Sequence, residues 1–238
     1  MSGTDSEGIR LNKYIASSGL CSRREADTLI ESGKVTINGE VAVQGTKVMS
    51  GDIVEVSGRK ITPDDSMVYI VFNKPLGVTC TTDQRDPSNI IDYIGYSERI
   101  FPVGRLDKNS SGLILLTNDG SIVNKLLRAE NGHEKEYIVT VNRPYDKNFL
   151  KSMESGVPVL GQLTLPCHLK PVNDKTFKII LHQGLNRQIR RMCEYLGYKV
   201  TRLKRIRFMN VTLGDLEPGK WRYLTDEEKK ELKKDITN

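Results

Sequence analysis

The centre of the chain reads FPVGRLDKNSSGLILLT over residues 101–117. Its first part is rich in glycine and serine and holds one acid, Asp107, between the cations Arg105 and Lys108. Its second part, residues 113–117, is a compact apolar run of the kind that forms a buried strand. Neighbouring positive charge keeps a carboxylate ionised, as a nucleophile or general base must be, although an acid in such a loop can also simply cap a turn. The stretch therefore predicts a polar loop that leads into a core strand and carries a candidate catalytic acid.

Apolar runs and helical patterns alternate on both sides of this loop. We predict strands at 68–72, 113–117, 138–141 and 177–181, helices at 120–129 and 187–196, and a short surface helix at 226–235. This order is typical of an α+β domain with a mixed or antiparallel central sheet flanked by helices. The glycines between 104 and 120 fit neither a phosphate-binding loop nor a dinucleotide fingerprint, so we expect no cofactor of either kind.

The first sixty residues have the pattern of a separate small module. A first helix ends at Gly19, and a capping box at residues 22–25 begins a second helix that ends at Gly33. A hairpin follows around the turn Asn38-Gly39, with a further strand at 53–56. We therefore expect a disordered segment at 1–8, a module at 9–62, a linker at 63–67 and a larger domain at 68–238.

Composition excludes several classes of protein. The chain has 238 residues and no run of about 18 apolar residues, and its first eight residues are small and polar rather than a secretory signal. We therefore expect a cytoplasmic protein that does not contact the membrane. The four cysteines stand far apart, and Cys167-His168 is the one adjacent pair of potential ligands, so we expect reduced thiols and no metal.

Positive charge is concentrated in residues 187–207. The whole chain carries +6, from 36 Lys and Arg against 30 Asp and Glu, whereas this segment alone has eight cations and one acid, Glu194. Such a cationic segment is typical of proteins that bind a polyanion, because each phosphate that is neutralised releases counterions. A nucleic acid is the favoured partner, and a solvated helix face that binds nothing is the alternative. The cations are Arg187, Arg190, Arg191, Lys199, Arg202, Lys204, Arg205 and Arg207.

The predicted helix at 187–196 has an apolar face and a basic face. At 100° per residue, Arg187 and Arg191 lie nearly opposite the apolar face, whereas Arg190 lies at its border. Arg190 is thus the arginine best placed to reach inward and pair with Asp107, and the other two can face RNA. The apolar face comprises Ile189, Met192, Cys193 and Leu196.

The small module carries a resemblance in three segments, which are RLNKY at 10–14, CSRREA at 21–26 and VTING at 35–39. It resembles the S4 RNA-binding domain. This resemblance implies that four cations lie along the exposed face of its two helices and bind the phosphates of a folded RNA. They are Arg10, Lys13, Arg23 and Arg24.

The larger domain carries a second resemblance in five motifs. These are NKPLG at 73–77, the stretch at 101–113, KEY at 135–137, GLNRQIRRM at 184–192 and GKWR at 219–222. The domain resembles the RNA pseudouridine synthases, specifically the branch that has an N-terminal S4 domain and modifies ribosomal RNA. With the S4 module, the resemblance covers about residues 9–228. It implies an isomerase that replaces the C1′–N1 bond of uridine by a C1′–C5 bond and needs no cofactor or metal.

The resemblance also implies roles for individual residues. Asp107 would attack the nucleotide or remove a proton from its ribose, and Arg190 would pair with Asp107. Tyr137 shares a strand face with two valines, which favours simple core packing; by resemblance it lines the uracil pocket and takes the proton from C5. Arg105 would occupy the space that the extruded base vacates, and Lys74 would contact phosphate or support the loop. The remaining predicted RNA-binding residues are Arg187, Arg191, Arg202, Lys204, Arg205 and Arg207.

Two further motifs, at 188–194 and 207–211, most resemble synthases that act on a hairpin of 23S rRNA. The expected partner is therefore 23S rRNA, either naked or in an assembling large subunit, bound by a monomer. The alternatives are small-subunit rRNA, another 23S uridine or tRNA, and a non-catalytic S4-type factor of ribosome assembly. Asn109 and the segment 182–185 depart from the family pattern, and both bear on the choice of substrate rather than on the reaction.

Overall fold

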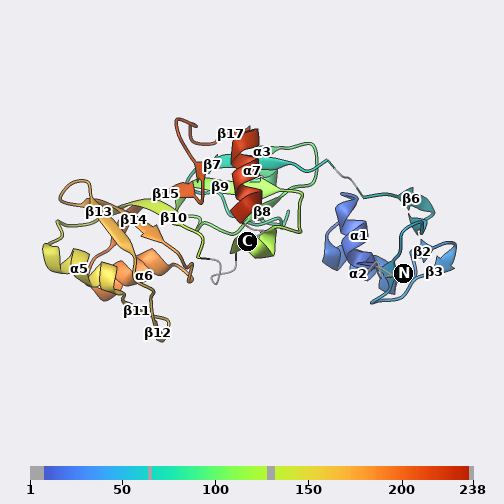
Figure 1. Ribbon diagram of the computed structural model, residues 1–238, viewed down its shortest axis with the longest axis horizontal. Coiled ribbons are helices and arrows are strands. Elements are labelled where there is room, and N and C mark those ends of the chain that lie inside the picture. Colours follow the sequence, from blue (N-terminus) through green and yellow to red (C-terminus); the bar gives the residue numbers. More distant parts are fainter. Residues whose placement is uncertain (1–7, 64–65, 128–131, 236–238) are drawn as a thin grey trace, which may run out of the picture. The chain divides into compact units, whose positions relative to one another are not determined.

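The computed structural model describes residues 8–63, 66–127 and 132–235, and contacts within these residues divide the chain into two units (Figure 1). The first unit comprises Met1–Met67 with Ser97–Arg99, and the second comprises Val68–Tyr96 with Ile100–Asn238. The second unit thus begins at the first residue of the predicted larger domain. The disorder predicted for residues 1–8 lies, except for Gly8, outside the described residues, and so do residues 64–65 of the predicted linker.

Two helices packed against short strands form the first unit. Its core contains Leu11 and Ile15 from the first helix and Ala26 and Ile30 from the second, all less than 5% exposed. The elements are β1 (Ile9–Arg10), α1 (Leu11–Ser17), α2 (Arg23–Glu31), β2 (Val35–Ile37), β3 (Glu40–Val41), β4 (Lys47–Val48), β5 (Val54–Val56) and β6 (Arg59–Ile61). The sheet order β3-β2-β5-β6 is antiparallel throughout.

Local signals in the sequence fix this unit. The Ser22 hydroxyl accepts the Glu25 N–H at 3.2 Å while Glu25 accepts the Ser22 N–H at 2.7 Å, which is the predicted capping box. Asn38 and Gly39 have φ values of 53° and 87°, as a type I′ hairpin turn requires. The helices and the hairpin are therefore where the sequence predicts them.

A mixed sheet forms the centre of the second unit, as predicted. Within the described residues it has nine strands, with β13-β14-β10-β15-β9-β7-β17 in order and β16 and β8 beside β15 and β9; β15 and β9 run parallel, and the other pairs are antiparallel. The elements of the second unit, in chain order, are β7 (Tyr69–Lys74), α3 (Ile90–Ile94), β8 (Phe101–Val103), β9 (Ser111–Thr117), α4 (Val123–Leu127), β10 (Lys135–Val141), α5 (Lys147–Ser155), β11 (Pro158–Val159), β12 (Gln162–Leu163), β13 (His168–Pro171), β14 (Thr176–Leu181), α6 (Gln188–Tyr195), β15 (Val200–Phe208), β16 (Val211–Thr212), β17 (Trp221–Tyr223) and α7 (Asp226–Asp235).

The half of the sheet around β7 and β9 is buried on both faces. Val71 and Leu115 pack in one core cluster with Leu232 of α7, which lies across these strands in Figure 1. Phe72 and Ile114 face the opposite cluster, which includes residues of α3. This explains the continuous apolar runs in the sequence. Helix α7 was predicted as a surface helix, but Leu232 is 1% exposed and part of the core.

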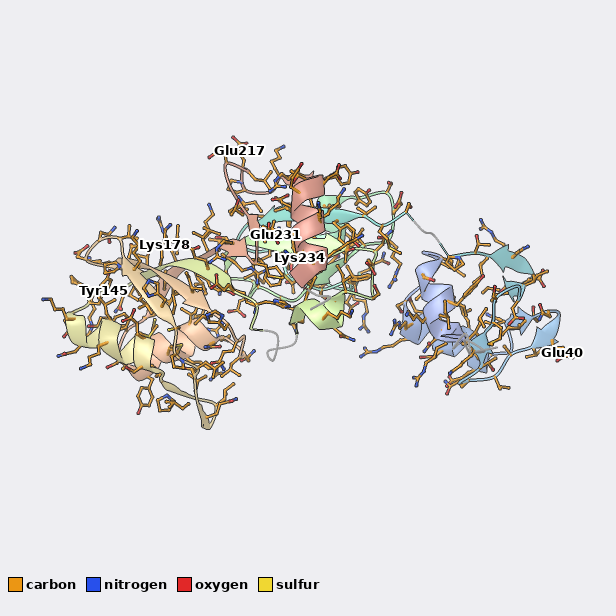
Figure 2. All side chains as sticks on the ribbon, in the orientation of Figure 1. Glu40, Tyr145, Lys178, Glu217, Glu231 and Lys234 are labelled. Carbon is orange, nitrogen blue, oxygen red and sulfur yellow. The ribbon has the colours of Figure 1, made fainter. Side chains whose placement is uncertain are left out.

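The other half, around β10 and β14, is covered by helices on one face. Phe177 and Ile179 pack against Phe149 of α5 and Met192 of α6 in a third cluster. Lys178 lies between them on β14 and projects from the opposite face (Figure 2). Its Nζ lies 3.6 Å from Glu136 Oε1. This half therefore shows the apolar–polar alternation of a sheet with one buried face.

The two halves meet where β9 and β15 run parallel. Only the pairs Lys204–Ser111 and Arg205–Gly112 join these strands among the described residues. Gly112 has φ 101°, and an added Cβ there would collide with the backbone carbonyl of Arg205. A glycine is therefore required at this junction, which directly follows the loop that holds Asp107.

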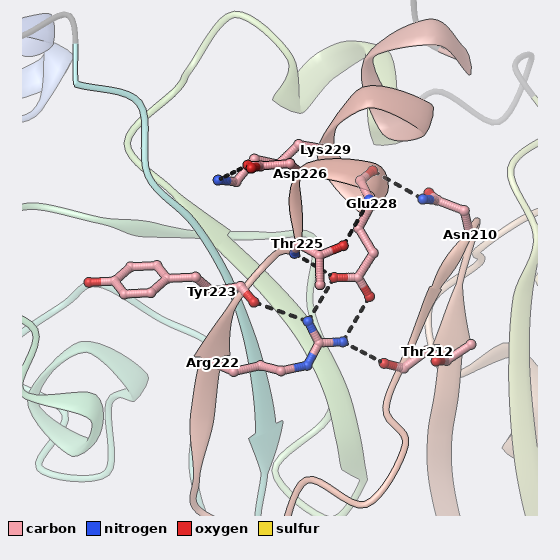
Figure 3. A network of polar contacts seen from close by, with 8 residues as sticks. All are labelled: Asn210, Thr212, Arg222, Tyr223, Thr225, Asp226, Glu228 and Lys229. Atoms are coloured by element: carbon pink, nitrogen blue, oxygen red, sulfur yellow. Dashed lines mark hydrogen bonds and ion pairs between the residues drawn. The ribbon is translucent and has the colours of Figure 1, made fainter.

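A polar network fastens α7 to the sheet (Figure 3). Arg222 of β17 donates two hydrogen bonds to the Glu228 carboxylate, at 2.7 and 2.8 Å, and one to the Thr212 carbonyl at 3.2 Å. Thr225 and Glu228 form a second capping box, because Glu228 N–H donates to the Thr225 hydroxyl and Thr225 N–H to Glu228. These contacts lower the pKa of Glu228 and raise that of Arg222.

The basic segment 187–207 is not one continuous surface. Its first part forms α6 and its last part forms β15, a central strand with β10 on one side and β9 on the other. Strand β15 was not among the predicted strands, because its apolar residues Val200, Leu203, Ile206 and Phe208 do not follow the two-residue period of a strand. In a separate respect, none of the described helices combines the length and the apolar composition that a transmembrane helix requires.

Candidate active site

Asp107 lies in the loop between β8 and β9, as the sequence predicts. The Ser110 N–H donates to the Asp107 backbone carbonyl at 2.9 Å and closes a tight turn there. The preceding residue, Leu106, is 8% exposed and belongs to the core cluster beside α3. The Asp107 side chain is 30% exposed. The carboxylate is therefore open to a ligand while its backbone is anchored in the core.

Two guanidinium groups from the start of α6 approach the same oxygen of Asp107. Arg190 Nε lies 3.6 Å and Arg187 Nη1 3.7 Å from Asp107 Oδ2. Arg187, the N-cap residue of α6, has φ 52°, a left-handed conformation that is uncommon outside glycine. The predicted inward position of Arg190 is present. Arg187 was predicted to face RNA, but the structure also places it beside Asp107.

Backbone carbonyls and a hydroxyl hold the Arg190 side chain. Arg190 Nη2 donates to the Asn109 carbonyl at 2.6 Å and to the Ser110 hydroxyl at 3.1 Å. Arg190 Nη1 donates a longer hydrogen bond, 3.4 Å, to the Val200 carbonyl. Among the described residues, buried Arg190 Nε has no hydrogen-bond partner. The one guanidinium nitrogen without a hydrogen-bond partner among the described residues is thus the atom that lies 3.6 Å from Asp107.

Tyr137 of β10 lies at the seam between two core clusters. Its ring is partly buried and packs against the cluster of α5 and α6 and also against the cluster of α3. Val139 and Val141 share its strand face and are less than 2% exposed, as the predicted alternation requires. Leu106 belongs to one of these clusters and Ile189 to the other. Tyr137 therefore packs against both cores that support Asp107 and Arg190.

The structure corrects the predicted phosphate contact of Lys74. This residue is 0% exposed, and its Nζ donates to the carbonyls of Pro75 at 2.9 Å and Val78 at 2.7 Å. Burial lowers the pKa of Lys74, and the negative charge of Asp107 acts in the opposite direction. Lys74 therefore fits the other role predicted for it, which is to support the loop.

Two further cations of the basic segment are taken up by internal contacts. Arg205 is 4% exposed, and its Nε donates to the Leu113 carbonyl at 2.7 Å. Arg207 forms ion pairs with Glu134 at 2.8 Å and Glu136 at 3.0 Å. Their predicted place on an RNA-binding surface is therefore corrected, since one is buried and the other is neutralised by acids that lie outside the segment.

The other predicted RNA-binding cations keep some exposure. Arg105, directly before Leu106, is exposed, and so is Arg202, while Lys204 and Arg191 are half-buried. Arg191 donates to the carbonyl and side chain of Asn186. In the first unit all four predicted phosphate-binding cations, Arg10, Lys13, Arg23 and Arg24, are exposed.

The cysteines are dispersed free thiols. Burial raises the pKa of Cys167 and of Cys193 to about 12, and it also raises the pKa of Cys21 and Cys80. All four thiols are therefore protonated at neutral pH. Within the described ranges, no three His, Cys, Asp or Glu side chains are grouped as a metal site would require.

The arrangement of Asp107, Arg190 and Tyr137 is accompanied by a clear similarity to known proteins. Residues 68–195 match the model of the RNA pseudouridylate synthases. The chain belongs to this family. Residues 9–54 of the synthase match the S4 domain, which confirms the predicted two-domain organisation.

Curated relatives place the synthase within its family. It is 56% identical over 92% of its length to the dual-specificity RNA pseudouridine synthase RluF of Salmonella typhi, of which it covers 76%. It is 52% identical over 97% of its length to RluF of Escherichia coli strain K12, covering 80% of that protein. Ribosomal large subunit pseudouridine synthase B of Bacillus subtilis is 38% identical, over 94% of this chain and 95% of that one. The predicted resemblance to the RNA pseudouridine synthases that have an N-terminal S4 domain is therefore confirmed, and RluF is among the relatives most similar to this chain.

A solved structure agrees with the fold. The crystal structure of a pseudouridylate synthase superposes with a TM-score of 0.69 at 30% identity, covering 94% of this chain and 99% of that one. The synthase is therefore an RNA-modifying isomerase with an N-terminal S4 domain, and the non-catalytic alternative does not fit these relationships.

The residues that support the site have no signal in the sequence. Ser110 and the Asn109 carbonyl orient Arg190, and Cys80 accepts the Leu106 N–H on its sulfur at 3.3 Å. No local pattern marks a hydrogen bond between residues 80 or 26 positions apart. The departure at Asn109 from the family pattern leaves this contact intact, because the group that binds Arg190 is the backbone carbonyl.

Proposed function

We propose that the synthase converts a uridine in a hairpin of 23S rRNA into pseudouridine and that Asp107 is its catalytic residue. The observation that carries this proposal is the pair of guanidinium groups, those of Arg187 and Arg190, within 3.7 Å of one half-buried carboxylate. The two guanidinium groups supply the opposite charge that can orient a carboxylate, and a carboxylate is a group that can attack carbon or accept a proton.

The reaction needs no net addition or loss of atoms by the uridine other than exchange of one proton. The C1′–N1 bond breaks, the base rotates, a C1′–C5 bond forms, and C5 then loses its hydrogen while N1 gains one. Two first steps are open to Asp107: attack on C1′, or removal of the proton on ribose C2′. Deuterium at C2′ distinguishes them, because it slows a step that breaks the C–H bond.

Tyr137 is proposed to line the uracil pocket and to take the proton from C5 in the last step. Its place between two core clusters supports the pocket role, since an aromatic ring at a seam can stack on an inserted base. Replacing Tyr137 with Phe retains the ring and removes the hydroxyl, so RNA binding should persist while tritium release from C5 slows.

Exposed cations are proposed to supply the binding energy that extrudes the nucleotide. Arg10, Lys13, Arg23 and Arg24 of the S4 domain would bind phosphate, together with Arg191, Arg202 and Lys204. Arg105 is exposed two residues before Asp107 and would fill the gap that the base leaves. Unstacking a base requires a few kcal/mol, and a few charge-assisted phosphate contacts can offset this.

A second RNA substrate is proposed, because the RluF relatives carry the description "dual-specificity", and a tRNA is one candidate for it. Small-subunit rRNA and other 23S uridines are the competing targets. A monomer is proposed, since one chain carries Asp107, Tyr137 and Arg190, and a cytoplasmic location is proposed because ribosomal RNA is found there. Light scattering of the purified protein measures whether it is a monomer.

The decisive experiment uses 23S rRNA labelled with tritium at uridine C5. Wild-type protein should release tritium, and Asp107→Asn should release none above the blank while it still binds the RNA. Equal release by the two proteins would refute the catalytic role. Mapping of pseudouridine in cellular RNA with and without the gene would identify the modified position and decide among 23S rRNA, 16S rRNA and tRNA.

A further inference from the structure

The two neighbours of Asp107 are both bonded to one segment, the turn that follows β7. On one side, the Leu106 N–H donates to Cys80 Sγ at 3.3 Å. On the other side, the Lys108 carbonyl accepts the Gly77 N–H at 2.9 Å. Each contact joins two residues that are far apart in the sequence, and the two contacts lie on either side of Asp107. The peptide that carries the carboxylate is thus held at both of its ends by residues 77–80.

The segment that makes these contacts is itself held in place. Lys74 Nζ donates to the carbonyls of Pro75 and Val78, which closes the turn, and this charged group is completely buried. Beyond the turn, the Thr79 N–H donates to the Ser88 carbonyl at 2.8 Å, and the Ile90 N–H donates to Thr79 at 2.9 Å. The turn is therefore held by hydrogen bonds of its own, in addition to its contacts with the loop of Asp107.

Within the segment 77–80, Cys80 is the residue that contacts the Asp107 loop through its side chain. It is 5% exposed and packs in the core cluster that also contains Phe72 and Leu106. A buried backbone N–H needs an acceptor, and the Leu106 N–H finds one in this sulfur. Burial raises the pKa of Cys80, so the acceptor is a neutral thiol at neutral pH.

We propose that Cys80 is a positioning residue, which fixes the Asp107 loop by accepting the Leu106 N–H on its sulfur. This inference rests on the proposed role of Asp107. The carboxylate must meet ribose within about 0.5 Å of its productive position while it stays beside Arg190, and a loop of glycine and serine does not hold that position by itself. Cys80 touches neither the substrate nor Asp107 and acts through the backbone of Leu106.

The test compares three variants in single-turnover reactions with saturating enzyme and 23S rRNA tritiated at uridine C5. Cys80→Ala removes the acceptor and should slow tritium release by about fivefold, as the loss of one buried hydrogen bond implies. Cys80→Ser replaces it with a hydroxyl and should recover most of the rate. Cys167→Ala is the matched control, because that thiol also makes one backbone contact, to the Met153 carbonyl, in the cluster of α5 and α6.

Two further readouts separate positioning from general stability. The RNA dissociation constant from filter binding should be unchanged in all three variants, and the melting temperature should fall no further in Cys80→Ala than in Cys167→Ala. Should the alanine variant fail to fold, Cys80→Val fills the space without an acceptor and takes its place. Equal rates for Cys80→Ala and Cys167→Ala, or a serine variant no faster than the alanine variant, would overturn the inference.

Failure of the inference and failure of the proposed function are distinguishable. If Asp107→Asn is inactive while every Cys80 variant has the rate of the control, the catalytic aspartate stands and the role of Cys80 is rejected. If Asp107→Asn retains the wild-type rate, the proposed function itself is rejected, whatever the Cys80 variants do.

Discussion

Cations occupy opposite environments in the two units of the chain. In the S4 unit, the predicted RNA-binding residues Arg23 and Arg24 begin α2 as exposed side chains. In the synthase unit, Lys74, Arg190 and Arg205 are 0%, 8% and 4% exposed. Each of these three donates to backbone carbonyls of loops or strands that surround Asp107.

A basic composition therefore serves two structural purposes in this protein. An exposed cation on a short module can bind phosphate and contributes to affinity and its salt dependence. A buried cation requires acceptors within the fold, and removal of the cation leaves them unsatisfied. The charge of residues 187–207 therefore overstates the cationic surface, because part of it holds the catalytic domain together.

Removal of Arg190 should have the largest effect. Arg190→Ala leaves Asp107 without its more buried partner and leaves the Asn109 carbonyl without a donor, so we expect turnover to fall roughly 100-fold or more. RNA affinity should change much less. The measurement is tritium release from bound complexes together with filter binding. Arg191→Ala in the same helix is the contrasting variant, because it should weaken RNA binding and leave the turnover of bound RNA unchanged. Loss of binding with normal turnover of bound RNA in Arg190→Ala would contradict the assignment.

Replacement of Lys74 should have the next largest effect and tests its corrected role. Lys74→Met preserves the buried stem and removes the charge that closes the turn beside Asp107, so we expect turnover to fall about tenfold. The salt dependence of RNA binding should stay that of the wild type, because no phosphate contact is lost. A smaller salt slope would show instead that Lys74 binds phosphate.

The difference in stability between the wild type and Lys74→Met should depend on pH. Burial lowers the pKa of Lys74 below its ordinary value of 10.5, so the folded protein releases this proton before the unfolded chain does. The unfolded state then binds more protons, and the stability of the wild type relative to Lys74→Met should rise as the pH approaches 10.5. Urea unfolding at several alkaline pH values measures this difference, and a fall would contradict the sign.

Changes in the S4 unit should affect binding and leave the chemistry unaltered. The double variant Arg23→Ala/Arg24→Ala should weaken RNA binding by about fivefold and lower the slope of log Kd against log salt by about 1 to 2. Single-turnover rates at saturation should equal the wild-type rate. Arg59→Ala/Lys60→Ala, with the same change in charge on β6 of the same unit, is the control. Equal losses in the two double variants would mean that net charge rather than position determines binding.

The smallest effect is expected at the Arg222–Glu228 pair that fastens α7. Glu228→Gln should lower the free energy of unfolding by about 1 kcal/mol at neutral pH, because the pair is partly solvated. The pKa of Glu228 is lowered in the folded protein. Its contribution to stability is therefore present above pH 4.5 and is lost as the pH falls through the pKa of the folded protein. Wild type and variant should therefore converge in acid-unfolding curves, and a gap that widens below pH 4.5 would contradict this.

The sequence predicted the parts of this protein that local rules govern. The capping box at Ser22, the Asn38-Gly39 turn and the apolar runs of β7 and β9 depend on contacts between near neighbours in the chain. Asp107 was found by its loop and by family resemblance. By contrast, β15 was missed because its apolar residues do not alternate with polar ones, and it is its pairing with strands on both sides that makes it a central strand.

The class of the protein, its two domains and the candidate catalytic groups could be predicted from the sequence, because short motifs and hydrophobic periods involve residues a few positions apart. Which cations face solvent and which are buried is known from the folded chain alone, since Arg190 and Arg205 donate to acceptors about 80 to 90 residues away in the sequence. A side chain's charge is a property of its residue type. Whether that charge binds RNA or supports the fold depends on acceptors that the folding of distant segments brings beside it.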